Sequence, residues 1–145
     1  MKIAVVGGGI VGATCAYYLS KEQKNELVVF DHGLGQATKA SAGIISPWFS
    51  KRRNKPWYKM ARLGADFYLK LVKDLEADGY NTNFYSQCGV YLLKKNEDKL
   101  PELKELAESR KELSPMIGDL EIISKEEVRK IIPSFDNNGD VLYAS

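Results

Sequence analysis

The sequence predicts an α/β fold that begins with a parallel βαβ unit. Three observations carry this prediction: an apolar, β-branched run at residues 2–6, a cluster of glycines at 7–12, and a second apolar run at 27–30. Short apolar runs of this kind are typical of strands buried in a parallel sheet. Residues 10–21 lie between the glycines and the second run, contain no proline and carry small and apolar side chains, as a helix packed on that sheet requires.

The spacing of the glycines indicates a dinucleotide-binding turn. Gly7, Gly9 and Gly12 form a G-x-G-x-x-G pattern directly after the first predicted strand. Gly7 permits a tight turn, Gly9 leaves room for a pyrophosphate, and Gly12 lets the helix pack closely on the strands. A tight strand-to-helix turn of any kind also favours glycine, but here the flanking strands and helix agree with the nucleotide interpretation.

Residues on either side of the predicted helix complete this candidate site. Ile10 and Val11 lie at the helix N-terminus, which offers unpaired N–H groups and a positive dipole end to a phosphate. Asp31 closes the second strand and is placed to accept hydrogen bonds from an adenosine ribose. Its neighbour His32 is included among the candidate binding residues.

Composition argues against several other functions. The hydrophobic content of 44% and charged content of 28% are ordinary for a globular domain, and a net charge of +2 without a basic, aromatic-interleaved face argues against a nucleic-acid partner. Cys15, Cys88 and the single histidine lack metal-ligand spacing. Cys15 is expected in the first helix as a small apolar residue, which fits a reducing compartment. With no run long enough to span a membrane, we expect a cytoplasmic protein.

The segment between Asp31 and Trp57 has no helical period. Its centre, residues 35–47, is rich in Gly, Ser, Thr and Ala. Small side chains and hydroxyls in an extended, irregular run suit a backbone that lies against a ligand, and a plain surface loop is the alternative. The basic run at 51–55 is expected to be solvated, with a substrate or membrane-surface role, and hence peripheral membrane association, as the alternative.

The remainder of the chain alternates predicted helices and strands. The predicted helices cover 57–75, 100–113 and the segment up to Pro133, the strands cover 84–93, 120–123 and 141–143, and a turn covers 136–139. Ser124 and Glu127 form a capping box at the start of the last helix. The final strand is expected to be an unfinished strand of an incomplete sheet, whose open edges favour self-association.

The glycine turn, Asp31, the run at 38–47 and the segments at 87–93 and 124–133 together resemble a known family. They are similar to the N-terminal part of the FAD-dependent amine and amino-acid oxidoreductases, which include glycine oxidase, sarcosine oxidase, D-amino-acid oxidase and D-amino-acid dehydrogenase. The resemblance covers nearly the whole chain. It implies a Rossmann-like FAD-binding segment at 1–80, with a flavin-facing loop and the following helix, and the beginning of an α+β substrate domain at 81–145.

The resemblance also implies FAD as the cofactor and assigns residue roles. Residues 7–12 would face the FAD pyrophosphate and Asp31 the adenosine ribose, while Thr38 and Lys39 would lie near the pyrophosphate or the ribityl chain. Backbone N–H groups beside the flavin ring can influence its electronics. The residues expected to run along that ring are Ser41, Ala42, Gly43 and Ile44.

The reaction implied by the resemblance is oxidation of an amine or amino acid, of the D-amino-acid, glycine or sarcosine type. It proceeds by hydride transfer from the carbon bearing the amine to the flavin, and the resulting imine is hydrolysed. Family members are much longer, and their later segments complete the FAD site and carry the arginine that binds a substrate carboxylate. We therefore assign no catalytic residue and expect the 145 residues alone to be inactive.

Two other functions remain as alternatives. A nicotinamide-dependent dehydrogenase shares the glycine motif and the acid, but the long loop of small residues before Trp57 argues against it. The second alternative is a non-catalytic remnant that binds a nucleotide weakly, or a partner chain through an open sheet edge.

Overall fold

The computed structural model describes residues 1–52, 55–94, 98–134 and 141–144, which form two compact units, Met1–Ile45 and Ser46–Ser145. The elements of the first unit are β1 (Lys2–Val6), α1 (Ile10–Ser20), β2 (Glu26–Phe30) and α2 (Ala37–Ala40). Those of the second are η1 (Pro47–Phe49), α3 (Lys55–Ala77), β3 (Val90–Leu93), α4 (Lys99–Lys111), η2 (Pro115–Ile117), β4 (Leu120–Ile123), α5 (Lys125–Ile131) and β5 (Val141–Ala144). The functional division near residue 80 stays a prediction.

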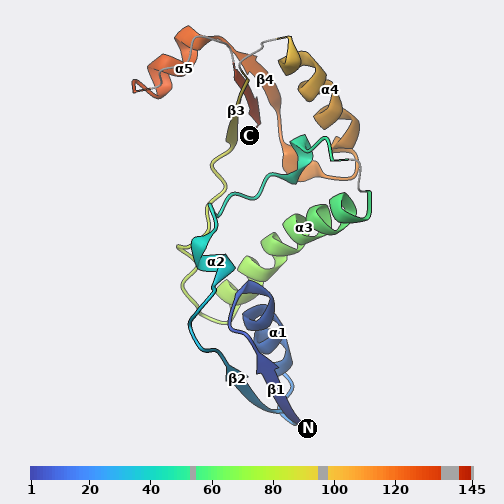
Figure 1. The fold of residues 1–145 in the computed structure, drawn as a ribbon, viewed down its shortest axis with the longest axis vertical. Coiled ribbons are helices and arrows are strands. Elements are labelled where there is room, and N and C mark those ends of the chain that lie inside the picture. The colour runs from blue at the N-terminus through green and yellow to red at the C-terminus, as the bar shows by residue number, and fades with distance from the viewer. Residues whose placement is uncertain (53–54, 95–97, 135–140, 145) are drawn as a thin grey trace. The chain divides into compact units, whose positions relative to one another are not determined.

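The first unit is the predicted βαβ unit. β1 and β2 pair in parallel, with Lys2 opposite Glu26 and Val6 opposite Phe30. α1 connects the two strands and packs beside both (Figure 1). The Gly7 N–H donates to the Phe30 carbonyl at 2.8 Å, so the parallel ladder continues to the first glycine of the turn. The strand ends and the helix start therefore converge at the glycine turn.

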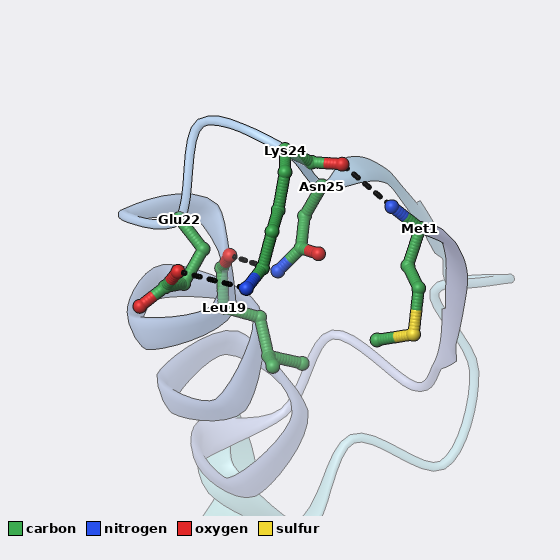
Figure 2. A network of polar contacts seen from close by, with 5 residues as sticks. All are labelled: Met1, Leu19, Glu22, Lys24 and Asn25. Carbon is green, nitrogen blue, oxygen red and sulfur yellow. Dashed lines mark hydrogen bonds and ion pairs between the residues drawn. The ribbon is translucent and has the colours of Figure 1, made fainter.

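A small polar network closes the opposite end of this unit (Figure 2). The Met1 ammonium donates to the Lys24 carbonyl at 2.5 Å, and the Asn25 side-chain amide donates to the Leu19 carbonyl at 3.0 Å. Lys24 and Glu22 form an ion pair at 3.8 Å. These contacts connect the end of α1 to the start of both strands, and they lie away from the glycine turn.

The second unit is built on an antiparallel sheet with the order β3-β5-β4. Leu142 in the central strand lies opposite Leu92 on one side and Ile122 on the other. The strand predicted at 141–143 is confirmed as β5, but it is the central strand of this antiparallel sheet and does not extend the sheet of β1 and β2. A short apolar run is compatible with a strand of either kind, and only its pairing partners distinguish the two.

The core of the second unit lies between this sheet, α4 and η1. η1 contributes Trp48 and Phe49, and the Arg110 guanidinium donates to the Trp48 carbonyl and lies 4.1 Å from the centre of the Tyr58 ring. Arg110 therefore connects η1, α3 and α4. The remaining buried members of the core are Ala65, Leu100, Leu103, Ala107, Ile117, Leu120, Leu142 and Ala144.

Several predicted element boundaries differ from the structure. The loop predicted to be irregular contains the short helices α2 and η1, each too short for its period to be recognised. The strand predicted over 84–93 is ordered as a strand only in β3, because Gly89 has a φ of +74° and the Tyr143 ring lies where a Cβ at this position would be. The predicted turn at 136–139 lies outside the described residues.

Other predictions are tested by individual side chains. Cys15 lies in α1 as predicted, but it is exposed. At the start of the basic run, Lys51 forms an ion pair with Glu102 at 2.6 Å and the Arg52 guanidinium lies 4.8 Å from the Trp57 ring centre, while residues 53–54 lie outside the described part. Within the described ranges, no helix is both long and apolar enough to cross a bilayer.

Candidate nucleotide-binding site

The turn between β1 and α1 depends on glycine at two positions. Gly7 has a φ of +101°, a conformation that residues with a Cβ rarely adopt. A Cβ added to Gly12 would overlap the Gly7 carbonyl oxygen and lie 3.4 Å from Val5 Cγ1. α1 therefore begins very close to the end of β1, as predicted from the tight turn at Gly7 and the close packing at Gly12, whereas their contact with a cofactor stays a prediction.

The N-terminus of α1 receives a hydrogen-bond partner from a distant segment. Gly9 is the N-cap residue and has no side chain, but the Ile10 N–H donates to Thr38 Oγ1 at 3.1 Å. A Cβ on Gly9 would lie 3.3 Å from the same oxygen. The first turn of α1 contains no acidic residue, so no side chain of the helix itself offsets its positive end, which favours an anion.

Asp31 is held by three donors at the end of β2. Its Oδ2 accepts from the Gly8 N–H at 2.5 Å, and its Oδ1 accepts from the Gly33 N–H at 2.7 Å and from Gln36 Nε2 at 3.0 Å. The Gly8 bond, followed by those from Gly33 and Gln36, holds the pKa of Asp31 below its ordinary value of 3.8. The carboxylate is therefore charged, oriented and still exposed at neutral pH.

The structure joins some of the predicted site residues and leaves the roles of others as predictions. The glycine turn, Asp31 and Thr38 are linked by the hydrogen bonds above. His32 Nδ1 accepts from the Leu34 N–H at 3.2 Å and so belongs to a local turn. The remaining predicted residues follow Thr38 in an exposed stretch, and they are Lys39, Ser41, Ala42, Gly43 and Ile44.

One hydrogen bond connects this exposed stretch to Thr38, which contacts the glycine turn. Ser41, which follows α2, donates from its Oγ to the Thr38 carbonyl at 2.9 Å. Thr38 is also the residue whose side chain contacts the start of α1. The chain bends at Ser41, and Gly43 has a φ of +69°, a conformation that favours glycine. These contacts determine the path of the loop beyond α2, and its position relative to a flavin ring stays a prediction.

Two contacts with Asp31, from Gly8 and from Gln36, were not predicted from the sequence. Gly8 positions Asp31 through its N–H, and a Cβ there would lie 3.2 Å from Asp31 Oδ2. Gln36 donates its side-chain amide to the same carboxylate. The third adjacent glycine was a usable signal for Gly8, because a residue without a Cβ permits this close approach. No sequence pattern singled out Gln36.

Comparison with known proteins identifies the class to which this site belongs. The family described as "FAD dependent oxidoreductase" (DAO) matches residues 2–145. The chain belongs to this family of FAD-dependent oxidoreductases. The resemblance drawn from the glycine turn, Asp31 and the following loop is confirmed, and the nicotinamide-dependent alternative is not favoured.

Individual relatives match along almost the entire chain. The uncharacterized oxidoreductase YurR of Bacillus subtilis (strain 168) is 40% identical over 97% of this chain and 38% of its own length. Glycine oxidase of the same organism is 28% identical over 99% of this chain and 37% of its own length. The crystal structure of iminodiacetate oxidase from Chelativorans sp. BNC1 superposes on 99% of this chain and 38% of its own, with a TM-score of 0.85 and 25% identity.

The residues present fit the cofactor of this family. Gly9 has no Cβ to crowd the start of α1, the α1 N-terminus carries no carboxylate of its own, and Asp31 is an ionised acceptor at the end of β2. These are the three features that a dinucleotide of the FAD type requires at a βαβ turn. The chain spans less than two fifths of the length of the relatives described above. It therefore corresponds to one segment of each of these longer proteins.

Proposed function

We propose that this chain forms the adenosine-side wall of an FAD site in an oxidoreductase that acts on an amine or an amino acid. The observation that carries the proposal is the hydrogen-bonded group around the β1–α1 turn, in which Gly8 holds Asp31 and Ile10 holds Thr38. The names of glycine oxidase and iminodiacetate oxidase support a substrate that bears an amine.

Each part of the site has a distinct binding role in this proposal. The N–H groups of Gly9, Val11 and Gly12 bind the pyrophosphate, and the Asp31 carboxylate accepts from the ribose hydroxyls. Thr38 positions α2, and the exposed residues 41–44 approach the flavin ring. FAD, when bound, supplies the hydride acceptor. The protein residues bind and orient the cofactor and contribute backbone dipoles beside it.

The second half of the chain is assigned to the substrate side of the site. Residues 81–145 begin a substrate domain, and the β3-β5-β4 sheet is its framework. Amino acids, including D-amino acids, glycine and N-substituted glycines such as sarcosine, are the proposed class. Oxygen or an electron-transport acceptor reoxidises the flavin. We expect turnover to require further segments, like those that the longer relatives have outside the region matched by this chain.

Two further properties are part of the proposal. We place the protein in the cytoplasm, supported by free thiols at Cys15 and Cys88. We also propose that the 145 residues self-associate through the two-stranded parallel sheet, because large apolar side chains on both strands, including Val6, Val28 and Phe30, are exposed.

The function is tested by a titration and a chimera. In the titration, FAD is added to the purified chain and flavin fluorescence is followed; we expect saturable binding but no peroxide release or dye reduction above the free-flavin blank. In the chimera, this chain replaces the matched segment of YurR, and the product is offered D-amino acids, glycine, sarcosine and iminodiacetate. We expect one or more of these to reduce the bound flavin under anaerobic conditions. A folded chimera that binds FAD and is reduced by none of them would contradict the substrate class.

A further inference from the structure

Gln36 contacts the candidate ribose acceptor through its side chain. Its Nε2 donates to Asp31 Oδ1 at 3.0 Å, and the other two donors to this carboxylate are the backbone N–H groups of Gly8 and Gly33. Gln36 is partly buried, although Asp31 and the residues around it are exposed. Among these three donors, only Gln36 can be removed by substitution without changing the backbone.

The position of Gln36 in the fold does not by itself account for this side chain. Gln36 is the N-cap residue of α2, a position at which Ser, Thr, Asp and Asn are preferred because their short side chains bond to the first turn. The Gln36 side chain makes no such capping bond. Its amide instead donates to Asp31. This contact indicates that the Gln36 side chain acts on the carboxylate and not on the start of α2.

The three bonds divide the two carboxylate oxygens unequally. An ionised carboxylate has about four acceptor sites, two on each oxygen. On Asp31, Oδ1 accepts from both Gly33 and Gln36, whereas Oδ2 accepts from Gly8. Oδ2 therefore keeps acceptor capacity for a ligand hydroxyl, and the two donors on Oδ1 keep the carboxylate from rotating.

We propose that Gln36 is a positioning residue that holds Asp31 so that Oδ2 accepts a hydrogen bond from a ribose hydroxyl of the bound dinucleotide. This inference rests on the proposed FAD site and adds a residue to it. The Gln36 bond also helps to keep the pKa of Asp31 low, so Gln36 favours the ionised carboxylate that the hydroxyl requires.

The test uses two nucleotides that differ only in the ribose hydroxyls. Binding of ADP and of 2′,3′-dideoxy-ADP is measured by calorimetry with the wild-type chain, Gln36→Ala and the control Gln23→Ala, which changes an exposed glutamine in the turn before β2. We expect Gln36→Ala to weaken ADP binding by about three- to tenfold, which is within the net range of one hydrogen bond. Gln23→Ala should bind as the wild type does, and dideoxy-ADP should bind equally to all three proteins.

The pH dependence provides a second readout that a general structural defect would not produce. Without the Gln36 bond the pKa of Asp31 rises, so the loss of ADP affinity on acidification should begin at a higher pH in Gln36→Ala than in the wild type. An equal loss for ADP and dideoxy-ADP, or unchanged ADP affinity, would overturn the role of Gln36. Failure of the wild-type chain to bind either ADP or FAD would instead overturn the proposed cofactor site, and this inference with it.

Discussion

Individual residues of the candidate site are held by partners that lie far away in the sequence. Thr38 bonds to the N–H of Ile10, and Asp31 bonds to the N–H of Gly8. The glycine pattern predicted where the turn would be, because the conformational and steric demands on Gly7 and Gly12 are local. It could not predict the Gln36 bond, because that contact depends on how the loop after β2 folds back on the carboxylate.

Gly12 provides a direct test of close packing at the turn. Because a Cβ at this position overlaps the Gly7 carbonyl oxygen, we expect Gly12→Ala to destabilise the fold by roughly 1–3 kcal/mol, the usual cost of overpacking. The control is Gly64→Ala in α3, where no atom lies within 4 Å of the added Cβ. That variant should stabilise by about 0.5–1 kcal/mol, since alanine favours a helix over glycine. Urea unfolding of both variants measures the difference.

The lowered pKa of Asp31 predicts that the free energy of unfolding depends on pH in the acid range. The pKa of Asp31 is lowered in the folded state, so the free energy that its three bonds contribute is fully present above its ordinary pKa of 3.8. This contribution is lost as the pH falls through the lower, folded-state value. We expect Asp31→Asn to reduce the acid sensitivity of the unfolding midpoint below about pH 4. Parallel acid dependence in the two proteins would contradict the role assigned to these bonds.

Secondary-structure elements were predictable where their signals are local. α5 begins as predicted: Ser124 Oγ accepts from the Glu127 N–H at 3.3 Å, and Glu127 Oε2 accepts from the Ser124 N–H at 3.1 Å. α2 was missed because one helical turn shows no period. Most of the strand predicted over 84–93 is not a strand: β3 begins at Val90, directly after Gly89, whose φ of +74° is not that of an extended strand. Local sequence predicts caps and turns better than it predicts where pairing stops.

The capping box of α5 can be tested by removing one hydroxyl. Ser124→Ala deletes the acceptor for the Glu127 N–H, and we expect a loss of about 1 kcal/mol in the free energy of unfolding. Ser124→Asp should restore most of it, because aspartate is also a good N-cap. The matched control is Ser109→Ala in α4, whose hydroxyl only donates to the Leu106 carbonyl one turn earlier. An equal loss in Ser109→Ala would contradict the capping assignment.

At the scale of the whole chain, the first unit was predictable and the sheet of the second was not. Strand, glycine turn, helix, strand and acid follow one another without interruption, so the βαβ unit could be predicted from neighbouring residues. The order β3-β5-β4 joins segments that are separated by α4, η2 and α5. Pairing over such separations depends on tertiary contacts, which short apolar runs do not encode individually.

The central position of β5 makes a quantitative prediction. Leu142 is fully buried and lies opposite Leu92 and Ile122, so Leu142→Ala should cost about 2–5 kcal/mol through lost burial and a residual cavity. Leu113 is 68% exposed, and Leu113→Ala should change stability by less than about 0.5 kcal/mol. Thermal and urea unfolding compare the two variants. Similar effects at both positions would contradict the placement of β5 at the centre of the core.

We propose that the glycine turn binds the diphosphate of FAD. The most direct measurement is an FAD titration of the wild-type chain and of Gly9→Val, followed by flavin fluorescence, with NAD⁺ as a competitor and circular dichroism as a check of folding. We expect saturable FAD binding by the wild type, little competition by NAD⁺, and at least about tenfold weaker binding by Gly9→Val. A valine at this position would crowd Thr38 Oγ1 and fill the space that we assign to the pyrophosphate. Unchanged FAD affinity in a folded Gly9→Val variant, or no FAD binding by the wild type, would contradict the account.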